Sequence, residues 1–216
     1  MPYIERDLLA YSYDNPDHAY RTGTNYPLPD GHAASIGHVI ASTAKLEGYL
    51  HTVVRHLSKI DDETARIFTA RLSTTPIISL IEDLVPERKP EMEKSLSELV
   101  KRLNYVFRIR NLVAHHEVTW NDYSLRFQSG SFAKKISDPR KTCFPIELDE
   151  MKNIALLAEL LASSCYNLLT DKASGLDLAI ATIENFEKEY NLPEDPTKHS
   201  NRISRTPSDF VPSYIF

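Results

Sequence analysis

The sequence has few of the residues that disulfide frameworks, metal centres and phosphate-binding glycine loops require. Its 216 residues include only two cysteines, Cys143 and Cys165, and six scattered glycines. Two cysteines without ligand spacing make neither a disulfide framework nor a zinc site, and the glycines form no phosphate-binding loop or nucleophile elbow. A reduced, cytoplasmic protein with no metal and no cofactor is therefore predicted.

Long hydrophobic runs are also missing. The best candidate, residues 154–162, is interrupted by Glu159, whereas a membrane-spanning helix needs about 20 apolar residues. The first residues (MPYIERDLLAYSYDN) lack the basic and then apolar pattern of a secretory leader. With 42% hydrophobic and 25% charged residues, the composition is that of an ordinary globular protein. No membrane partner is expected.

Proline and tyrosine mark the two ends of the chain. Eight of the 13 prolines lie in residues 1–29 or 193–216, and five of the 11 tyrosines occur by position 26. These segments have no helical or strand periodicity. We therefore predict an extended N-terminal arm over residues 1–30, a helical domain over 31–191, and an extended C-terminal tail over 192–216.

Apolar residues between the two arms recur mainly at three- and four-residue steps, which is typical of helices that bury one face. The pattern predicts helices at about 32–59, 61–72, 73–84, 87–115, 149–169 and 176–190. Asp30, Ser73 and Asp149 are the expected capping residues. Short alternation at Tyr123, Leu125 and Phe127 predicts a small β-hairpin or loop. The predicted fold is all-α: an antiparallel helical bundle with this insertion, about 117–148, between the fourth and fifth helices.

The end of the fourth predicted helix carries an arginine where an apolar residue is expected. On a helical wheel, Arg110 falls at the centre of the stripe formed by residues such as Leu103, Val106 and Phe107. An unpaired buried guanidinium is costly. This end of the helix is therefore predicted to meet a carboxylate, an anionic ligand or a wet cleft.

A polar line runs beside the apolar stripe. Its members follow steps of three and four residues: Lys101, Asn104, Arg108, Asn111 and His115. Asn111 and His115 are four residues apart, close enough for a hydrogen bond that would fix the imidazole. Together with Arg110 and the adjacent His116, this inventory suits a phosphodiester, because imidazole can move a proton while guanidinium groups stabilise a phosphorane. No metal is required.

The string Arg110-Asn111-Leu112-Val113-Ala114-His115 resembles the arginine–polar–x–x–x–histidine signature of the HEPN superfamily, the helical ribonucleases of toxin–antitoxin, abortive-infection and CRISPR systems. Family members carry this signature late in a long helix of a bundle. An early Leu-Glu pair and a following tryptophan are matched in this chain by Leu46-Glu47 and Trp120. The resemblance covers roughly residues 32–190.

The resemblance implies a homodimer whose two signatures face each other across a cleft that holds RNA. The RNA 2′-hydroxyl then attacks the neighbouring phosphate, giving a cyclic phosphate and a 5′-hydroxyl. On this hypothesis His115 is the acid and base, Arg110 stabilises the transition state, and Asn111 orients His115 or the phosphate. The remaining candidates contact substrate or, in the last case, orient the site: Arg108, His116, Lys101, Asn104 and Glu47. His115 lies about 140° from Arg110 on a regular helix, so the helix is expected to end or distort near Ala114.

Each assignment has a structural alternative. Arg110 could pair with Glu47 as a bundle contact, and His115 and His116 could be cations favoured by the C-terminal end of a helix dipole. Arg108 could lie on a solvated face. Trp120 and Tyr123 could stack on bases, but a core role in the hairpin is favoured.

Three functions follow from these residues. The first is a metal-independent endoribonuclease, a toxin or phage-defence effector held in check by a separate regulator or antitoxin protein. The second is a non-catalytic HEPN module that binds RNA or a protein. The third is a nucleotide-binding subunit that works with a separately encoded nucleotidyltransferase, since no transferase motif occurs in this chain.

The net charge of −5 conceals a basic block. Residues 101–141 hold nine lysines or arginines against three acids, a surplus of six positive charges, so the remaining residues carry −11. An anionic strand therefore has a predicted track along the end of the signature helix and the insertion that follows it.

Overall fold

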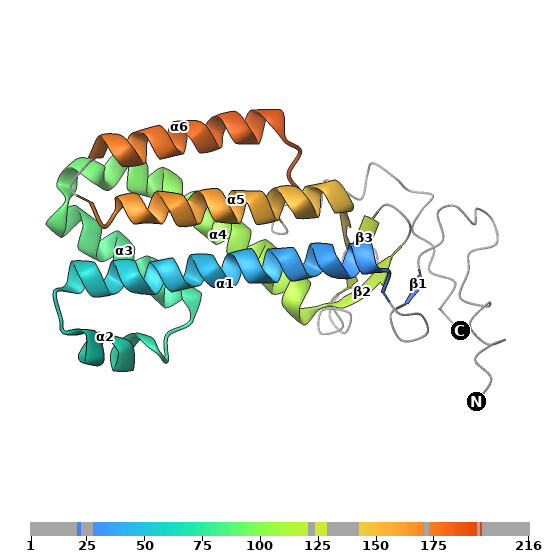
Figure 1. Ribbon diagram of the computed structural model, residues 1–216, viewed down its shortest axis with the longest axis horizontal. Helices are drawn as coiled ribbons and strands as arrows, with labels where there is room; N and C mark the ends of the chain where they lie inside the picture. Colours follow the sequence, from blue (N-terminus) through green and yellow to red (C-terminus); the bar gives the residue numbers. More distant parts are fainter. Residues whose placement is uncertain are drawn as a thin grey trace, which may run out of the picture.

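The computed structural model describes residues 21–22, 28–120, 124–128, 143–170, 173–193 and 195. The prediction of a mainly helical chain is confirmed (Figure 1). Its α-helices are α1 (Asp30–Ser58), α2 (Asp62–Thr69), α3 (Thr74–Arg88), α4 (Glu93–His115), α5 (Leu148–Asn167) and α6 (Ala173–Glu189). Its strands are β1 (Arg21–Thr22), β2 (Glu117–Trp120), β3 (Ser124–Gln128) and β4 (Cys143–Glu147).

The helices α1 and α5 lie side by side along the length of the molecule, with α4 behind them and α6 on the far side of α5 (Figure 1). Within the described part of the chain, no helix is long and apolar enough to cross a membrane. The helix α3 packs against α1 and α4 at the end away from the strands. Apolar residues that recur at three- and four-residue steps along the predicted helix 32–59 are buried in α1: Val39, Leu46, Leu50 and Val53 have no exposed surface.

Buried side chains form two clusters along the molecule. The larger, which we call the helical core, joins α1, α3, α4, α5 and α6 around residues such as Leu50, Leu103 and Leu161. The smaller, the sheet-end core, joins the start of α1, the end of α4, the strands and the start of α5. Its buried members are Val39, Ile109, Leu112, Val113, Trp120, Leu125, Phe127, Ile146, Met151, Ile154 and Ala155.

The strands form one antiparallel sheet in the order β1-β2-β3-β4. The strands β2 and β3 are neighbours in the sequence and pair in register, with Trp120 opposite Leu125. Because side chains alternate across a strand, Leu125 and Phe127 both point into the sheet-end core. Trp120 is 2% exposed, so its predicted core role is confirmed, while Tyr123 lies outside the described residues.

One strand pairing comes from the predicted N-terminal arm. Arg21 lies opposite Trp120 and Thr22 opposite Thr119, so β1 extends the sheet at the edge of β2. At the opposite edge, β4 pairs with β3 and leads directly into α5.

The predicted helix 87–115 is wrong at its start. The helix α3 continues to Arg88, and the backbone then leaves the helical region at Lys89, with φ −145° and ψ 64°. A 3-10 turn at Pro90–Met92 follows before α4 begins. The cause is Pro90, because a proline ring disfavours the helical conformation of the residue before it. Two predicted caps also move by one or two residues, since Pro29 precedes α1 and Glu147 caps α5 in a capping box with Glu150.

Candidate functional site

The last turns of α4 hold the signature residues. The helix stays regular to His115, and the next residue, His116, is extended, with φ −110° and ψ 148°. The chain therefore leaves the helix one residue beyond Ala114, close to the end expected from the sequence. Asn111 and His115 are exposed and Arg110 is half-buried, while their neighbours Leu112 and Val113 lie in the sheet-end core.

Arg110 reaches solvent because the buried face of α4 rotates near its end. The buried residues up to Phe107 face one direction, and those from Ile109 onward face about 130° away on a regular helix. Arg110 continues the first direction, which packs into the helical core nearer the start of α4. The described residues of the sheet-end core come from α1, α4, α5 and the strands, so a different partner covers the last turns of α4. The guanidinium is therefore not enclosed in the core.

Arg110 is held by its neighbour in the sequence. Its Nη1 donates a hydrogen bond to Oδ1 of Asn111 over 3.0 Å. Asn111 and His115 are one turn apart on the same face of α4. The hydrogen bond therefore brings the Arg110 guanidinium round the helix to the face that carries His115. The hydrogen bond predicted between Asn111 and His115 does not occur among the described contacts, where Asn111 accepts from Arg110.

The two histidines at the end of α4 have different surroundings. His115 is exposed in the last turn. His116 is half-buried, and its Nδ1 is buried without a hydrogen-bond partner among the described residues. An imidazole nitrogen in that position can still donate or accept a hydrogen bond. Only His115 presents its ring to solvent beside Asn111 and Arg110.

Lys101 and Arg108, two cations of the polar line, are already paired. Lys101 Nζ contacts Glu98 Oε1 over 2.6 Å. Arg108 binds both carboxylate oxygens of Asp195, with 3.1 Å between Nε and Oδ1. Asn104, also on this line, is half-buried. The structure thus places Arg108 at a carboxylate, and it places Lys101 about 21 Å along the helix from His115.

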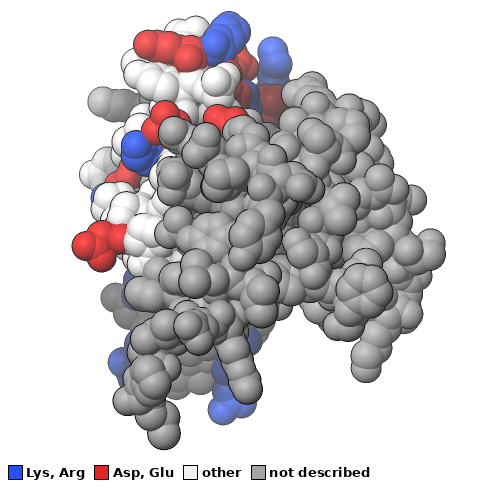
Figure 2. All heavy atoms as spheres, turned by 90° about the vertical axis from the view of Figure 1, so that its right-hand side faces the viewer, with Lys and Arg blue, Asp and Glu red and all other residues white. Residues whose placement is uncertain are grey.

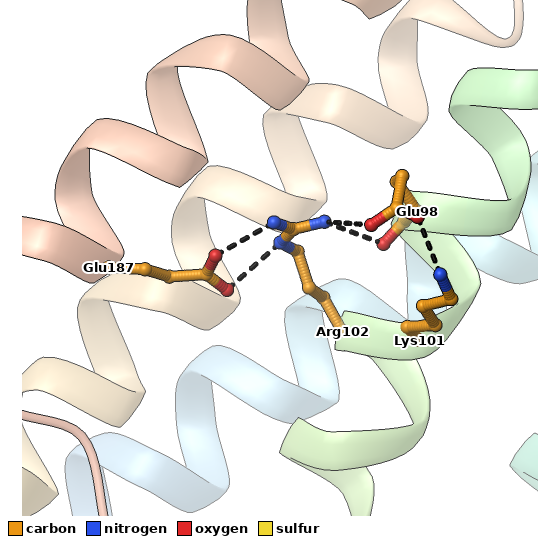
Figure 3. A network of polar contacts seen from close by, with 4 residues as sticks. All are labelled: Glu98, Lys101, Arg102 and Glu187. Atoms are coloured by element: carbon orange, nitrogen blue, oxygen red, sulfur yellow. Dashed lines mark hydrogen bonds and ion pairs between the residues drawn. The ribbon is translucent and has the colours of Figure 1, made fainter.

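A further ion pair on α4 lies outside the predicted site. Arg102 forms a bidentate ion pair with Glu187 of α6, with 2.9 Å from Nε to Oε1 and 2.8 Å from Nη2 to Oε2. Its Nη1 also contacts Glu98 over 3.2 Å (Figure 3). The side chain is 12% exposed, and the bidentate geometry is that of a strong charge-assisted pair. This contact holds α6 against α4.

Glu47 is separate from the signature. Its Oε1 accepts a hydrogen bond from the Thr74 hydroxyl over 2.7 Å, at the start of α3. The helices α1 and α4 bring Val39, not Glu47, beside Ile109 and Leu112, and Glu47 lies about 12 Å further along α1 than Val39. Among the described contacts, the predicted orienting role of Glu47 toward Arg110 has no support.

The structure describes the surroundings of only part of the basic block. Four of its cations lie on described parts of α4, and Lys101, Arg102 and Arg108 have carboxylate partners there. Arg110 has none among the described residues. Lys134, Lys135, Arg140 and Lys141 lie outside the described residues, as does the Arg126 side chain. In the view onto the sheet end, acidic and basic side chains are intermixed on the upper described surface (Figure 2).

Sequence reasoning missed Asp195 and the path of the chain that carries it. Tyr105 donates its hydroxyl proton to the Pro193 carbonyl, and Leu192 packs against both cores. Glu187 in the last turn of α6, Pro193 and Asp195 thus contact Arg102, Tyr105 and Arg108, which follow each other at three-residue steps along α4. An acidic residue in a segment without periodicity gives no local signal of such a contact.

Comparisons with family models, curated proteins and solved structures find no match to this chain. Over the residues that the structure describes, no group of three or more histidine, cysteine or acidic side chains is arranged to hold a metal ion. The chemistry of the site therefore has to be argued from Arg110, Asn111 and His115 themselves.

Proposed function

We propose that this chain is a metal-independent endoribonuclease of the HEPN type. The observation that carries the proposal is the hydrogen bond from Arg110 to Asn111, because it supports a guanidinium and an exposed imidazole on one face at the end of one helix. A guanidinium that has no carboxylate partner among the described residues is available to a phosphate, which it matches with paired donors.

The proposed step is an intramolecular transesterification of a phosphodiester in the RNA. The 2′-oxygen forms a bond to the adjacent phosphorus, the bond from phosphorus to the 5′-oxygen breaks, and a 2′,3′-cyclic phosphate results. An imidazole acts as the base and takes the proton from the 2′-hydroxyl. A second group acts as the acid and gives a proton to the departing 5′-oxygen. Arg110 stabilises the additional negative charge on the phosphorane. Asn111 accepts the hydrogen bond from Arg110 and so holds the guanidinium in place for the phosphate.

Two copies of the chain supply the two proton-transfer groups in this proposal. The step needs a base and an acid at once, whereas each chain presents one exposed histidine at the end of α4. A symmetric pair brings a second His115 to the other side of the phosphate. Such an enzyme would act as a toxin or defence effector, with a separate regulatory protein restraining it.

The test is cleavage of a labelled RNA in EDTA by the wild-type chain and by Arg110→Ala and His115→Ala. The matched controls are Arg88→Ala and His56→Ala, since Arg88 and His56 also lie in the last turn of a helix and are exposed. We expect both site variants to lose at least about 100-fold in rate, and both controls to cleave like the wild type.

The other outcomes are informative in different ways. Cleavage that survives in both site variants, or that EDTA abolishes, would contradict the mechanism. Binding of RNA by a wild-type protein that cuts none of a pool of random sequences would favour the non-catalytic binding module.

A further inference from the structure

The segment that follows α6 forms a strap over α4. We use this name for residues 190–193 and 195. The backbone carbonyl of Asn191 accepts a hydrogen bond from the Asn153 side chain over 2.7 Å, and Pro193 is buried and accepts from Tyr105. These contacts fix the strap on both α5 and α4 just before Asp195. The strap is therefore held by groups other than the ion pair at its end.

The carboxylate of Asp195 sits where a phosphate would bind Arg108. The guanidinium contacts both carboxylate oxygens through Nε and Nη2, the two-point geometry that arginine also uses for phosphate. Arg108 belongs to the same polar line as Asn111 and His115, and His115 lies about 10 Å further along the helix. A strand whose phosphate reaches Arg110 can therefore place a neighbouring phosphate at Arg108.

The ion pair is open enough to be exchanged. The Arg108 side chain is 39% exposed and that of Asp195 is 17% exposed. Because solvent reaches the Arg108 guanidinium, water screens this ion pair, and an anion from solution can replace the carboxylate. A phosphate that replaces the carboxylate recovers the same kind of contact, and the Tyr105 and Asn153 contacts can keep the rest of the strap in place.

We propose that Asp195 is a built-in competitor for a phosphate-binding position on Arg108, so that the strap weakens binding of a polynucleotide at the end of α4 until its phosphates displace the carboxylate. This inference rests on the proposed function, because it assigns a role to the same helix face. It adds a residue that restrains the site from within the chain.

The test measures binding of a fluorescent single-stranded oligodeoxynucleotide, which has the phosphates of RNA but no 2′-hydroxyl to react. Asp195→Asn removes the competing charge, and we expect it to bind about 3- to 10-fold tighter than the wild type. Freeing one arginine adds about one phosphate contact, so the salt dependence should steepen by about 0.7 in log Kd per log salt. Adding Arg108→Gln to Asp195→Asn should remove both gains.

Two further variants separate displacement from net charge and from damage to the fold. Asp83→Asn makes the same charge change on an exposed position of α3, and it should leave the salt dependence unchanged. Tyr105→Phe loosens the strap without changing charge, and it should tighten binding in the same direction as Asp195→Asn. Equal effects of Asp83→Asn and Asp195→Asn, or no gain in Asp195→Asn with an unchanged thermal midpoint, would overturn the inference.

Cleavage of RNA by the same proteins is measured separately. One outcome is that the wild type cleaves no RNA while Asp195→Asn binds the oligonucleotide more tightly and with a steeper salt dependence. That result would refute the nuclease and support Asp195 as a competitor for phosphate at Arg108. Cleavage that depends on Arg110 and His115, without any gain in Asp195→Asn, would refute the competitor and retain the nuclease.

Discussion

Arg110 and Asn111 are joined through their side chains, with 3.0 Å between Nη1 of the arginine and Oδ1 of the amide. Consecutive residues on a helix point about 100° apart, so this contact requires the guanidinium to fold back along the helix surface. It fixes a flexible cation beside the line that carries His115. In the proposed site, Asn111 therefore acts on the reaction through Arg110.

This relationship predicts a non-additive pair of substitutions. Asn111→Ala should lower the rate of RNA cleavage about 10-fold, because Arg110 loses its fixed position, whereas Arg110→Ala should lower it about 100- to 1,000-fold. The double variant should be no slower than Arg110→Ala alone. Single-turnover rates in EDTA test this, with thermal midpoints as the control for folding. Effects that multiply in the double variant would show that Asn111 acts independently of Arg110.

Arg102 and Lys101 offer a matched pair for stability. Arg102→Met removes a side chain that is 12% exposed and leaves Glu187 without its bidentate partner, and we expect a loss of about 2 kcal/mol in the free energy of unfolding. Lys101 is 67% exposed, and its pair with Glu98 spans three residues of one helix, so Lys101→Met should have no measurable effect.

Urea unfolding followed by the fluorescence of Trp120, the single tryptophan of the chain, measures both changes. Trp120 is buried in the sheet-end core, so its emission reports loss of that core. Equal midpoints for the two variants would show that the ion pair between α4 and α6 does not stabilise the fold.

We predict that the Cys165 thiol does not react in the folded chain. Complete burial in α5 raises the pKa of this thiol to about 12. At pH 8, in a Cys143→Ser background, a disulfide reagent such as DTNB should label Cys165 only after the chain is unfolded, because the thiolate is the reactive form. Rapid labelling of the native protein would show that α5 opens readily.

The raised pKa of the Cys165 thiol also predicts the direction in which stability changes with pH. The thiol pKa is higher in the folded chain than its ordinary value of about 8.5, so the unfolded chain loses this proton first. The contribution of the Cys165 thiol to the free energy of unfolding is constant below about pH 8 and falls as the pH rises toward 12. Cys165→Ala should therefore show a shallower loss of stability over that range than the parent chain.

The helices could be predicted from the sequence because their signal is local. The seam from Val39 to Leu57 repeats within one element, and the Pro90 rule that interrupts the predicted helix 87–115 also acts between neighbours. The pairing of β1 with β2 joins residues 21–22 to 119–120. No periodicity in such a short strand indicates its partner.

The candidate site likewise has one part that the sequence predicts and another that only the fold reveals. The positions of Arg110, Asn111 and His115 on one helix end follow from their spacing, but which residue of α1 lies beside the end of α4 depends on how the two helices pack. The contact between Arg108 and Asp195 joins residues 87 apart, and only the tertiary path of the strap reveals it. Sequence therefore locates the cations, and the fold determines which of them have partners.

The most direct test of the proposed chemistry is the effect of one missing oxygen in the substrate. An RNA cleaved by the wild-type chain in EDTA is compared with the same strand carrying a 2′-deoxy nucleotide just before the cleaved bond, and the product ends are identified by mass spectrometry. Attack by the 2′-oxygen predicts a 2′,3′-cyclic phosphate and a 5′-hydroxyl from the RNA, and no cut at the 2′-deoxy position. Cleavage at that position, or products with 5′-phosphate ends, would contradict this mechanism.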